Sequence, residues 1–241
     1  MQNTTPDWLF RRIQKFSAEF GKKAGGYPTL TTLTQRVPEF IGTRDFYRKI
    51  SSATKITHEW VEKQLGSLEI SLPESFFVFT PGAIFGPAKQ WPLEHFRTLA
   101  TLLHNVFGDP ILILCTEADV KSGAEISLGL DFVQNYCGQT SLSELLAILA
   151  KAKLLVGNDS GSMHLMSALQ RPQISIFGST SLDWTAPINP NATVLSRNLS
   201  CSPCFSRTCR FAHYDCLKRI EPELVLEETL KLLTEKNQTE A

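Results

Sequence analysis

The sequence predicts an α/β fold, in which a parallel, Rossmann-like sheet carries helices on both faces. From Phe76 onward, short apolar runs of strand length alternate with longer segments whose apolar residues recur at helical spacing. Polar loops follow three of these apolar runs, at the position where parallel α/β sheets bind their ligands. The sequence therefore predicts a sheet with ligand-binding loops along the carboxyl ends of its strands.

Six apolar segments are expected to form the strands of this sheet. The first begins at Phe76 and is ended by the Pro81-Gly82 pair, which favours a turn. The expected strands are 76–80, 111–115, 132–136, 154–156, 173–177 and 193–195.

Helices are expected between these strands. Ser141 and Glu144 have the spacing of a capping box, in which each side chain accepts a hydrogen bond from the other residue's amide. Pro92 suits a first helical turn, where its missing N–H group is not needed. The expected helices are 92–106, 118–129, 141–152, 162–169 and 221–233.

Residues 1–72 differ in pattern from the rest of the chain. Apolar residues recur at helical spacing over 8–22, glycines and a proline interrupt the pattern at 25–28, and another helical stretch is expected over 56–65. This region shows no strong strand and no chemical motif. We therefore expect a mostly helical N-terminal segment, 1–72, and a ligand-binding domain with a C-terminal helix, 73–241.

Composition excludes several classes of function. The 241 residues include 24 Lys and Arg against 24 Asp and Glu, and the resulting zero net charge argues against a general nucleic-acid binder. No apolar run is long enough to cross a bilayer, and the first residues lack the apolar core of a signal peptide. We expect a cytoplasmic protein that binds no nucleic acid.

The first motif is the loop 80–92, between an expected strand and an expected helix. Its glycines allow a ligand to approach the backbone, and Lys89 offers a mobile positive charge, so a diphosphate is a natural partner. The spacing of a P-loop is absent. On residue types alone, a surface loop with a solvated lysine is an equally good interpretation.

The second motif is the segment 157–164, also between a strand and a helix. Amide groups at the start of that helix can hold phosphate oxygens, and the Ser160 hydroxyl can add a hydrogen bond. Asp159 is expected to cap the helix or to bond a sugar hydroxyl. His164 could face the ligand, although a half-buried structural histidine is the favoured interpretation of this residue alone. A third polar loop, 178–181, is expected at the same edge of the sheet.

Four cysteines cluster near the C-terminus and surround His213: Cys201, Cys204, Cys209 and Cys216. The first pair has the spacing of a zinc site, but the others match no standard zinc finger. A thiol-rich loop packed near the ligand-binding edge is favoured over a structural metal, and a reducing compartment disfavours disulfides. An Asp-x-Asp metal motif is also not found, which suggests that Lys89 and helix dipoles neutralise the phosphates and that no metal cofactor is used.

Together these motifs resemble the ADP-heptose:lipopolysaccharide heptosyltransferases of glycosyltransferase family 9, and most closely the heptosyltransferase II type. The resemblance covers about residues 76–235, and the string of cysteines is its most specific part. The matching strings are Pro-Gly-Ala-x-Phe-Gly-Pro-Ala-Lys-x-Trp-Pro at 81–92, Asn-Asp-Ser-Gly-x-Met-His at 158–164, Phe-Gly-Ser-Thr at 177–180 and Cys-Ser-Pro-Cys-Phe-x-Arg-Thr-Cys-Arg-Phe-x-His-Tyr-Asp-Cys-Leu at 201–217.

The resemblance implies a GT-B fold, in which two Rossmann-like domains face a cleft and the C-terminal domain binds the donor. It implies a metal-independent, inverting transfer of heptose from ADP-heptose to a lipid A-linked inner-core oligosaccharide, with a peripheral contact at the inner membrane. Glu117 would bond the ribose, while Thr140 and Leu142 would line the adenine pocket. The remaining donor-site residues implied are Thr80, Gly82, Ala83, Lys89, Asp159, Ser160, Gly161 and His164.

The chain departs from the family pattern before the lysine loop. Family members carry about one domain more sequence there, whereas 80 residues precede Pro81 in this chain. The family's general base is expected in that N-terminal region, and no residue here can be assigned to it. Residues 1–72 are interpreted as a remnant of the acceptor domain or as unrelated sequence. An active transferase, a donor-binding module without turnover and a metal-stabilised interaction domain are the three hypotheses, in that order.

Overall fold

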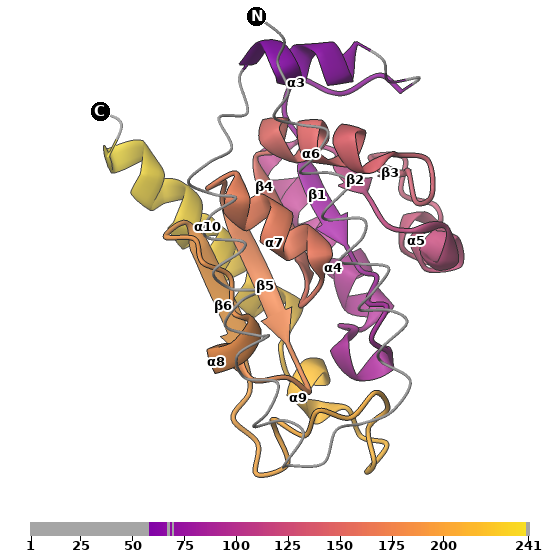
Figure 1. The fold of residues 1–241 in the computed structure, drawn as a ribbon, viewed down its shortest axis with the longest axis vertical. Helices are drawn as coiled ribbons and strands as arrows, with labels where there is room; N and C mark the ends of the chain where they lie inside the picture. The colour runs from indigo at the N-terminus through magenta and orange to yellow at the C-terminus, as the bar shows by residue number, and fades with distance from the viewer. Residues whose placement is uncertain (1–57, 67, 69, 240–241) are drawn as a thin grey trace, which may run out of the picture. The chain divides into compact units, whose positions relative to one another are not determined.

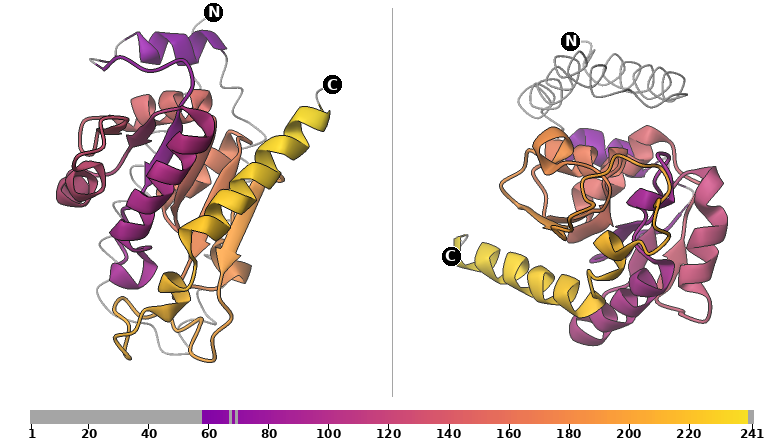
Figure 2. Two further views of the ribbon diagram at one scale, coloured as in Figure 1. Left: turned by 180° about the vertical axis from the view of Figure 1, so that it is seen from behind. Right: turned by 90° about the horizontal axis from the view of Figure 1, so that it is seen from below.

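The computed structural model describes residues 58–66, 68 and 70–239, all within one compact unit of the chain, Ile56–Ala241. A six-stranded parallel sheet forms the centre of this unit (Figure 1). Helices cover both faces of the sheet, with α4 and α10 on one side and α6 and α7 on the other (Figure 2). The predicted Rossmann-like α/β fold is confirmed, while the helix expected over 8–22 lies outside the described residues.

All six expected strands are present in the sheet, with each end within two residues of the expected position. Their order is β3-β2-β1-β4-β5-β6, and every neighbouring pair runs parallel. The strands are β1 Phe77–Thr80, β2 Ile111–Ile113, β3 Val133–Asn135, β4 Leu154–Asn158, β5 Gln173–Phe177 and β6 Ala192–Ser196.

The strand order creates a topological switch between β1 and β4. From β1 the chain moves outward through β2 and β3, and it then returns to the other side of β1 as β4. Thr80 at the end of β1 lies beside Gly157 in β4, so the two following loops start next to each other. Such a switch point is where open α/β sheets form a ligand crevice.

The helices expected among the described residues are present, whereas short helical elements at 87–89, 182–185 and 215–218 were not expected. The segment expected as a single helix over 118–129 is a 3-10 turn, η2 (Glu117–Asp119), followed by α5 (Val120–Ser127). The predicted capping box of Ser141 and Glu144 is present at the start of α6. The other helical elements are α3 His58–Leu65, η1 Pro87–Lys89, α4 Leu93–Phe107, α6 Leu142–Lys151, α7 Gly161–Ala168, α8 Leu182–Thr185, α9 Asp215–Lys218 and α10 Pro222–Thr239.

Aromatic side chains join the first strand to the helices that follow it. Phe79, Trp91 and Phe96 are fully buried, and the Trp91 and Phe96 rings meet edge to face at 4.8 Å. The Trp91 indole also donates a hydrogen bond of 2.8 Å to the carbonyl of Ile220, which directly precedes Glu221 and α10. This buried contact fixes the end of the lysine loop to the C-terminal helix.

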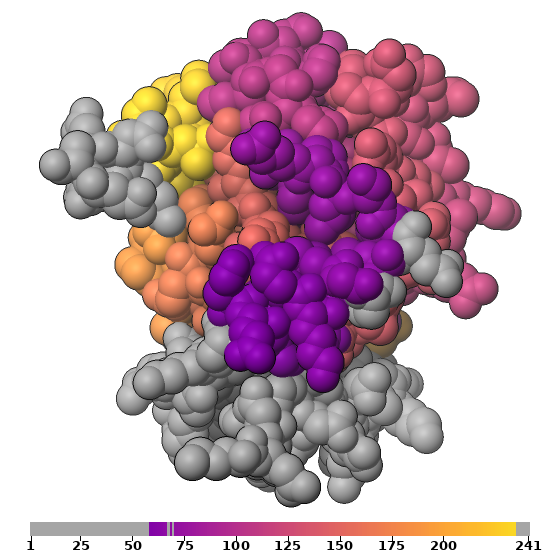
Figure 3. All heavy atoms as spheres, turned by 90° about the horizontal axis from the view of Figure 1, so that it is seen from above, coloured from indigo at the N-terminus to yellow at the C-terminus, as the bar shows by residue number. Residues whose placement is uncertain are grey.

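Helix α3 corresponds to the helical stretch expected over 56–65. It buries only Val61, while most of its other side chains lie at the surface (Figure 3). An ion pair of 2.5 Å joins Glu62 to Lys151 of α6, but both side chains are more than a third exposed, so the pair adds little stability. Among the helices that the structure describes, none combines the length and the apolar character that crossing a membrane requires.

Candidate functional site

Asn158, the last residue of β4, holds both ends of the lysine loop. Its side-chain oxygen accepts a hydrogen bond of 3.0 Å from the amide of Trp91, and its side-chain nitrogen donates one of 2.6 Å to the carbonyl of Pro81. The residue is fully buried. The sequence analysis did not single out Asn158, although its place between a strand and Asp159 offered a signal for this role.

Lys89 and Asp159 form a buried ion pair across the switch point. The Lys89 Nζ and Asp159 Oδ2 atoms are 2.5 Å apart, and only 11% and 3% of the two side chains are exposed. The same carboxylate oxygen accepts hydrogen bonds from the hydroxyl groups of Thr180 (2.6 Å) and Thr185 (3.3 Å). A buried pair of this kind is held in place, because separating it would leave an uncompensated charge in the protein.

This geometry corrects two expectations. Asp159 does not cap helix α7, because its carboxylate is engaged by Lys89 and two threonines, and a charged partner binds it more strongly than an amide would. Ser160 occupies the N-cap position instead, without a capping hydrogen bond from its side chain. Lys89 is not solvated, since it is buried at the end of η1.

The start of α7 presents polar groups without protein partners. The hydroxyl oxygen of Ser160 is buried and has no hydrogen-bond partner among the described residues, and the same holds for Thr80. A Cβ atom added at Gly161 would meet nothing within 4 Å, so the space beside the helix start is open. Free amides at a helix start together with a hydroxyl group suit a phosphate.

His164 lies on the first turn of α7, near the ion pair. Burial lowers the pKa of His164 to about 4, Asp159 opposes this shift and Lys89 adds to it. The imidazole is therefore neutral at neutral pH, so it can act as a hydrogen-bonding group but not as a cation toward a ligand.

The third polar loop and the cysteine loop, 199–216, are joined to the lysine loop by backbone hydrogen bonds. The amide of Ser179 donates to the carbonyl of Ala88 (3.2 Å), and the carbonyl of Ser179 accepts from Cys204 (3.1 Å) and Phe205 (2.7 Å). The amide of Ala88 donates to the carbonyl of Arg207 (2.9 Å). The expected packing of a thiol-rich loop beside the ligand-binding edge is confirmed.

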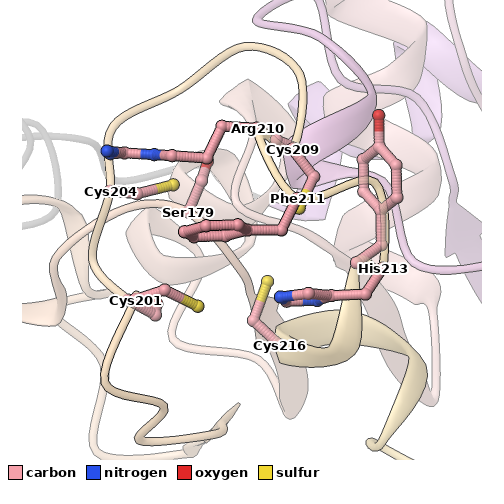
Figure 4. Close-up of a pocket in the computed structure, with 11 residues that line it drawn as sticks. Ser179, Cys201, Cys204, Cys209, Arg210, Phe211, His213 and Cys216 are labelled. Carbon is pink, nitrogen blue, oxygen red and sulfur yellow. The ribbon is translucent and has the colours of Figure 1, made fainter.

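The four clustered thiols face a small cavity together with Phe211 and His213 (Figure 4). The volume of about 20 Å³ suits roughly one water molecule and is far below that of a nucleotide. All four cysteines are free, and burial together with the neighbouring thiols raises the pKa of Cys216 to about 11. In the described part of the chain, no three His, Cys, Asp or Glu side chains are arranged to hold a metal ion.

The remaining candidate residues follow β1, β2 and β3, at the same carboxyl end of the sheet. The Gly82 amide donates a hydrogen bond of 3.3 Å to Cys115 Sγ, and a Cβ atom at Gly82 would come 2.5 Å from the Asp119 carboxylate. The lysine loop therefore lies directly against η2, which contains the exposed Glu117. Ala83 is buried in the lysine loop, whereas Thr140 and Leu142 flank the N-cap of α6 after β3.

The candidate residues at the carboxyl end of the sheet thus form two groups. The Lys89–Asp159 pair, Ser160, Gly161 and His164 gather at the β1–β4 switch, while Glu117, Thr140 and Leu142 lie on the β2 and β3 side of it. Gly82 lies where the two groups meet, in contact with η2.

Comparisons with known proteins agree with this architecture. The model of glycosyltransferase family 9 (heptosyltransferase) matches residues 40–215. Lipopolysaccharide heptosyltransferase 2 of Salmonella typhimurium is 34% identical over 181 residues, which cover 72% of this chain and 52% of that protein. The chain spans about half the length of the curated relatives it matches.

Two solved structures share the fold. The ADP-heptose lps heptosyltransferase II of E. coli aligns with a TM-score of 0.65 and 29% identity, covering 76% of this chain and 54% of that one. The E. coli heptosyltransferase WaaC, solved with ADP-2-deoxy-2-fluoro heptose, aligns with a TM-score of 0.51 and 25% identity over 70% of this chain and 47% of that one. The chain therefore belongs to glycosyltransferase family 9, the family of the heptosyltransferases.

Proposed function

We propose that this chain binds ADP-heptose and contributes the donor-binding domain, residues 73–241, to the transfer of heptose to the lipopolysaccharide inner core. The observation that carries the proposal is the Lys89–Asp159 pair beside the open start of α7, at the switch point of the sheet. The E. coli relative solved with an ADP-heptose analogue supports the choice of donor. The acceptor is a lipid A-linked inner-core oligosaccharide, which would bring the protein to the cytoplasmic face of the inner membrane.

Stabilisation of the departing ADP is the chemical task of this domain. An acceptor hydroxyl attacks the anomeric carbon, the bond to the diphosphate breaks, and the configuration at that carbon is inverted. The negative charge that develops on the departing diphosphate is stabilised by the amides at the start of α7, the Ser160 hydroxyl and the Lys89 ammonium. These groups would hydrogen-bond the departing diphosphate without a divalent metal. The base that activates the acceptor is assigned to no described residue.

The nucleoside would lie on the β2 and β3 side of the switch. Glu117, exposed on η2, is the candidate for the ribose hydroxyls, and Thr140 and Leu142 at the start of α6 are candidates for the adenine. Residues 1–72 are proposed as part of the acceptor side.

The test is calorimetric titration of the full chain with ADP and ADP-heptose. Lys89→Met alone would leave a buried carboxylate unpaired, so the informative variant is the double change Lys89→Met with Asp159→Asn, which removes both charges. We expect ADP binding to weaken by about 1.5–3 kcal/mol, or roughly 10- to 150-fold.

A matched control is the double change Lys153→Met with Asp109→Asn. The two side chains of this pair are 2.6 Å apart and precede β4 and β2, at the amino ends of the strands. Removal of this pair should leave ADP affinity unchanged. A wild-type chain that binds neither ligand would contradict the proposal. Binding of ADP-heptose without transfer to an inner-core acceptor would identify a donor-binding module that needs a further part for turnover.

A further inference from the structure

Two cysteines outside the cysteine loop lie beside each other where β2 and β3 end. The last paired residues of these parallel strands are Ile113 and Asn135. Two residues further along, the same register places Cys115 opposite Cys137. The ladder reaches this point, because the amide of Gly138 donates a hydrogen bond of 2.8 Å to the Cys115 carbonyl. The two side chains therefore lie on the same face of the sheet.

The two thiols are in direct contact. The Cys115 thiol donates a hydrogen bond to the sulfur of Cys137, and both residues are free thiols in this structure. Neighbouring strands lie about 4.8 Å apart, and a disulfide joins Cα atoms separated by about 4.4–6.8 Å. The backbone positions of this pair therefore suit a disulfide bond, which could form without a rearrangement of the sheet.

The contact makes one thiol a proton donor and the other a proton acceptor. The hydrogen bond from Cys115 lowers the pKa of the Cys137 thiol, although burial and the Asp119 carboxylate oppose this shift. The same hydrogen bond and burial raise the pKa of the Cys115 thiol. Cys115 is partly exposed, whereas Cys137 is buried. The sulfur that a small oxidant can reach is therefore able to pass its proton to its buried neighbour as it reacts.

The Cys115 sulfur also holds the lysine loop. It accepts a hydrogen bond of 3.3 Å from the Gly82 amide. Glu117, the candidate for the ribose hydroxyls, follows Cys115 by two residues, and a Cβ atom at Gly138 would lie only 3.0 Å from the Glu117 Cα atom. The loops after β2 and β3 are thus packed tightly around the thiol pair. A change at these sulfurs would therefore reach the lysine loop and the nucleoside side of the switch.

We propose that Cys115 and Cys137 form a reversible disulfide under oxidising conditions, and that this modification weakens binding of the nucleotide. Formation of the bond draws the Cys115 sulfur toward Cys137 and away from the Gly82 amide, so the lysine loop loses a hydrogen bond. Disulfides in reducing compartments are usually transient or redox-sensing, which fits a modification of this kind. The effect on the nucleotide rests on the proposed function, whereas formation of the disulfide does not.

The oxidant is a hydroperoxide, for example hydrogen peroxide. The Cys115 sulfur attacks one peroxide oxygen while its proton passes to deprotonated Cys137, the O–O bond breaks, and hydroxide leaves. The product at Cys115 is a sulfenic acid. Cys137 then loses its proton to this hydroxide, giving water, and its sulfur displaces hydroxide from the Cys115 sulfur to form the S–S bond. Each sulfur loses one electron overall, and the peroxide gains both.

The experiment oxidises the full-length chain with hydrogen peroxide, alkylates the remaining thiols and digests the protein with trypsin. The two cysteines fall on separate peptides, 98–121 and 122–151, neither of which contains a cysteine of the cysteine loop. We expect mass spectrometry to find these peptides joined by a disulfide, and dithiothreitol to separate them. Cys115→Ala should abolish the cross-link, whereas Cys204→Ala, which removes a free thiol of the cysteine loop, should retain it.

Two further readouts follow the effect on the lysine loop. In the ligand-free chain, oxidation should shift the NMR resonance of the Gly82 amide, because its hydrogen-bond acceptor moves. In calorimetry, oxidation should weaken ADP binding about fivefold, as expected for the loss of one hydrogen bond that positions the loop, and dithiothreitol should restore it. Cys204→Ala should respond to peroxide as the wild type does, whereas the ADP affinity of Cys137→Ala should not respond.

An oxidised wild-type chain without the cross-link would overturn the inference. An oxidised, cross-linked chain that binds ADP as tightly as the reduced chain would also overturn it, and both results leave the proposed function intact. A reduced wild-type chain that binds no ADP would contradict the proposed function and the effect on the nucleotide. The cross-link and the Gly82 shift would in that case still decide whether the thiol pair is a redox site coupled to the lysine loop.

Discussion

Lys89 and Asp159 are 70 residues apart in the sequence, yet their charged groups meet at 2.5 Å in the space between β1 and β4. The lysine follows β1 and the aspartate follows β4, so the pair closes the switch point of the sheet. Thr180 and Thr185, which follow β5, add hydrogen bonds to the same carboxylate oxygen. Loops after three adjacent strands are thus joined by one buried carboxylate.

Asp159→Ala should strongly destabilise the protein. The change leaves the buried Lys89 ammonium without its partner, and breaking one side of a buried ion pair costs about 3–5 kcal/mol. Urea unfolding followed by circular dichroism would measure the loss in free energy of unfolding. Asp109→Ala, which breaks a more exposed pair with Lys153, should cost about 1 kcal/mol or less. Equal losses for the two variants would contradict the role given to the buried pair.

Asn158→Ala should loosen the lysine loop. The variant loses the hydrogen bonds to Trp91 and Pro81 and leaves a buried amide and carbonyl without partners, which together should cost about 2–4 kcal/mol. Hydrogen exchange at the Trp91 amide should accelerate more than exchange within β3, the edge strand that does not pair with β4. Unchanged protection at Trp91 would show that other contacts hold the loop.

His164 should make stability depend on pH in the acidic range. Burial lowers its pKa in the folded chain to about 4 from the ordinary histidine value of 6.5, so the unfolded chain binds more protons between these values. The free energy of unfolding should therefore fall as pH drops from about 6.5 toward 4, by up to roughly 3 kcal/mol. Denaturation of His164→Gln across this range should show a correspondingly shallower slope, and parallel curves would contradict the assignment.

Gly86→Ala should disrupt the contact between the lysine loop and the cysteine loop. The added methyl group would meet the Arg207 carbonyl at 2.7 Å, and the backbone has a φ of +139°. Gly108→Ala is a suitable comparison, because Gly108 also has a positive φ, +73°, but its added Cβ would meet nothing within 4 Å. We expect thermal unfolding to show a loss of about 1 kcal/mol for Gly108→Ala and a larger loss, with weaker ADP binding, for Gly86→Ala.

Local patterns of the sequence were sufficient to predict the strands and the longer helices of the fold. Strand-length apolar runs gave the six strands, and the Ser141–Glu144 spacing gave the capping box at α6, because both signals depend on residues within one element. The lysine loop and the Asp159 turn were recognised as candidate ligand loops for the same reason. The cysteine string identified the family most specifically.

Partners of the site residues were decided by the tertiary structure. Asp159 was expected to cap α7 or to bond a sugar hydroxyl, since capping is the usual role of such a residue at a helix start. The strand order instead places a buried ammonium beside it, and the stronger electrostatic interaction determines its partner. In the same way, Arg207 reaches the lysine loop only because Gly86 admits its backbone and the β5 loop supports it. The sequence by itself determined the strands, the longer helices and the loops between them, while long-range packing determined which charges meet.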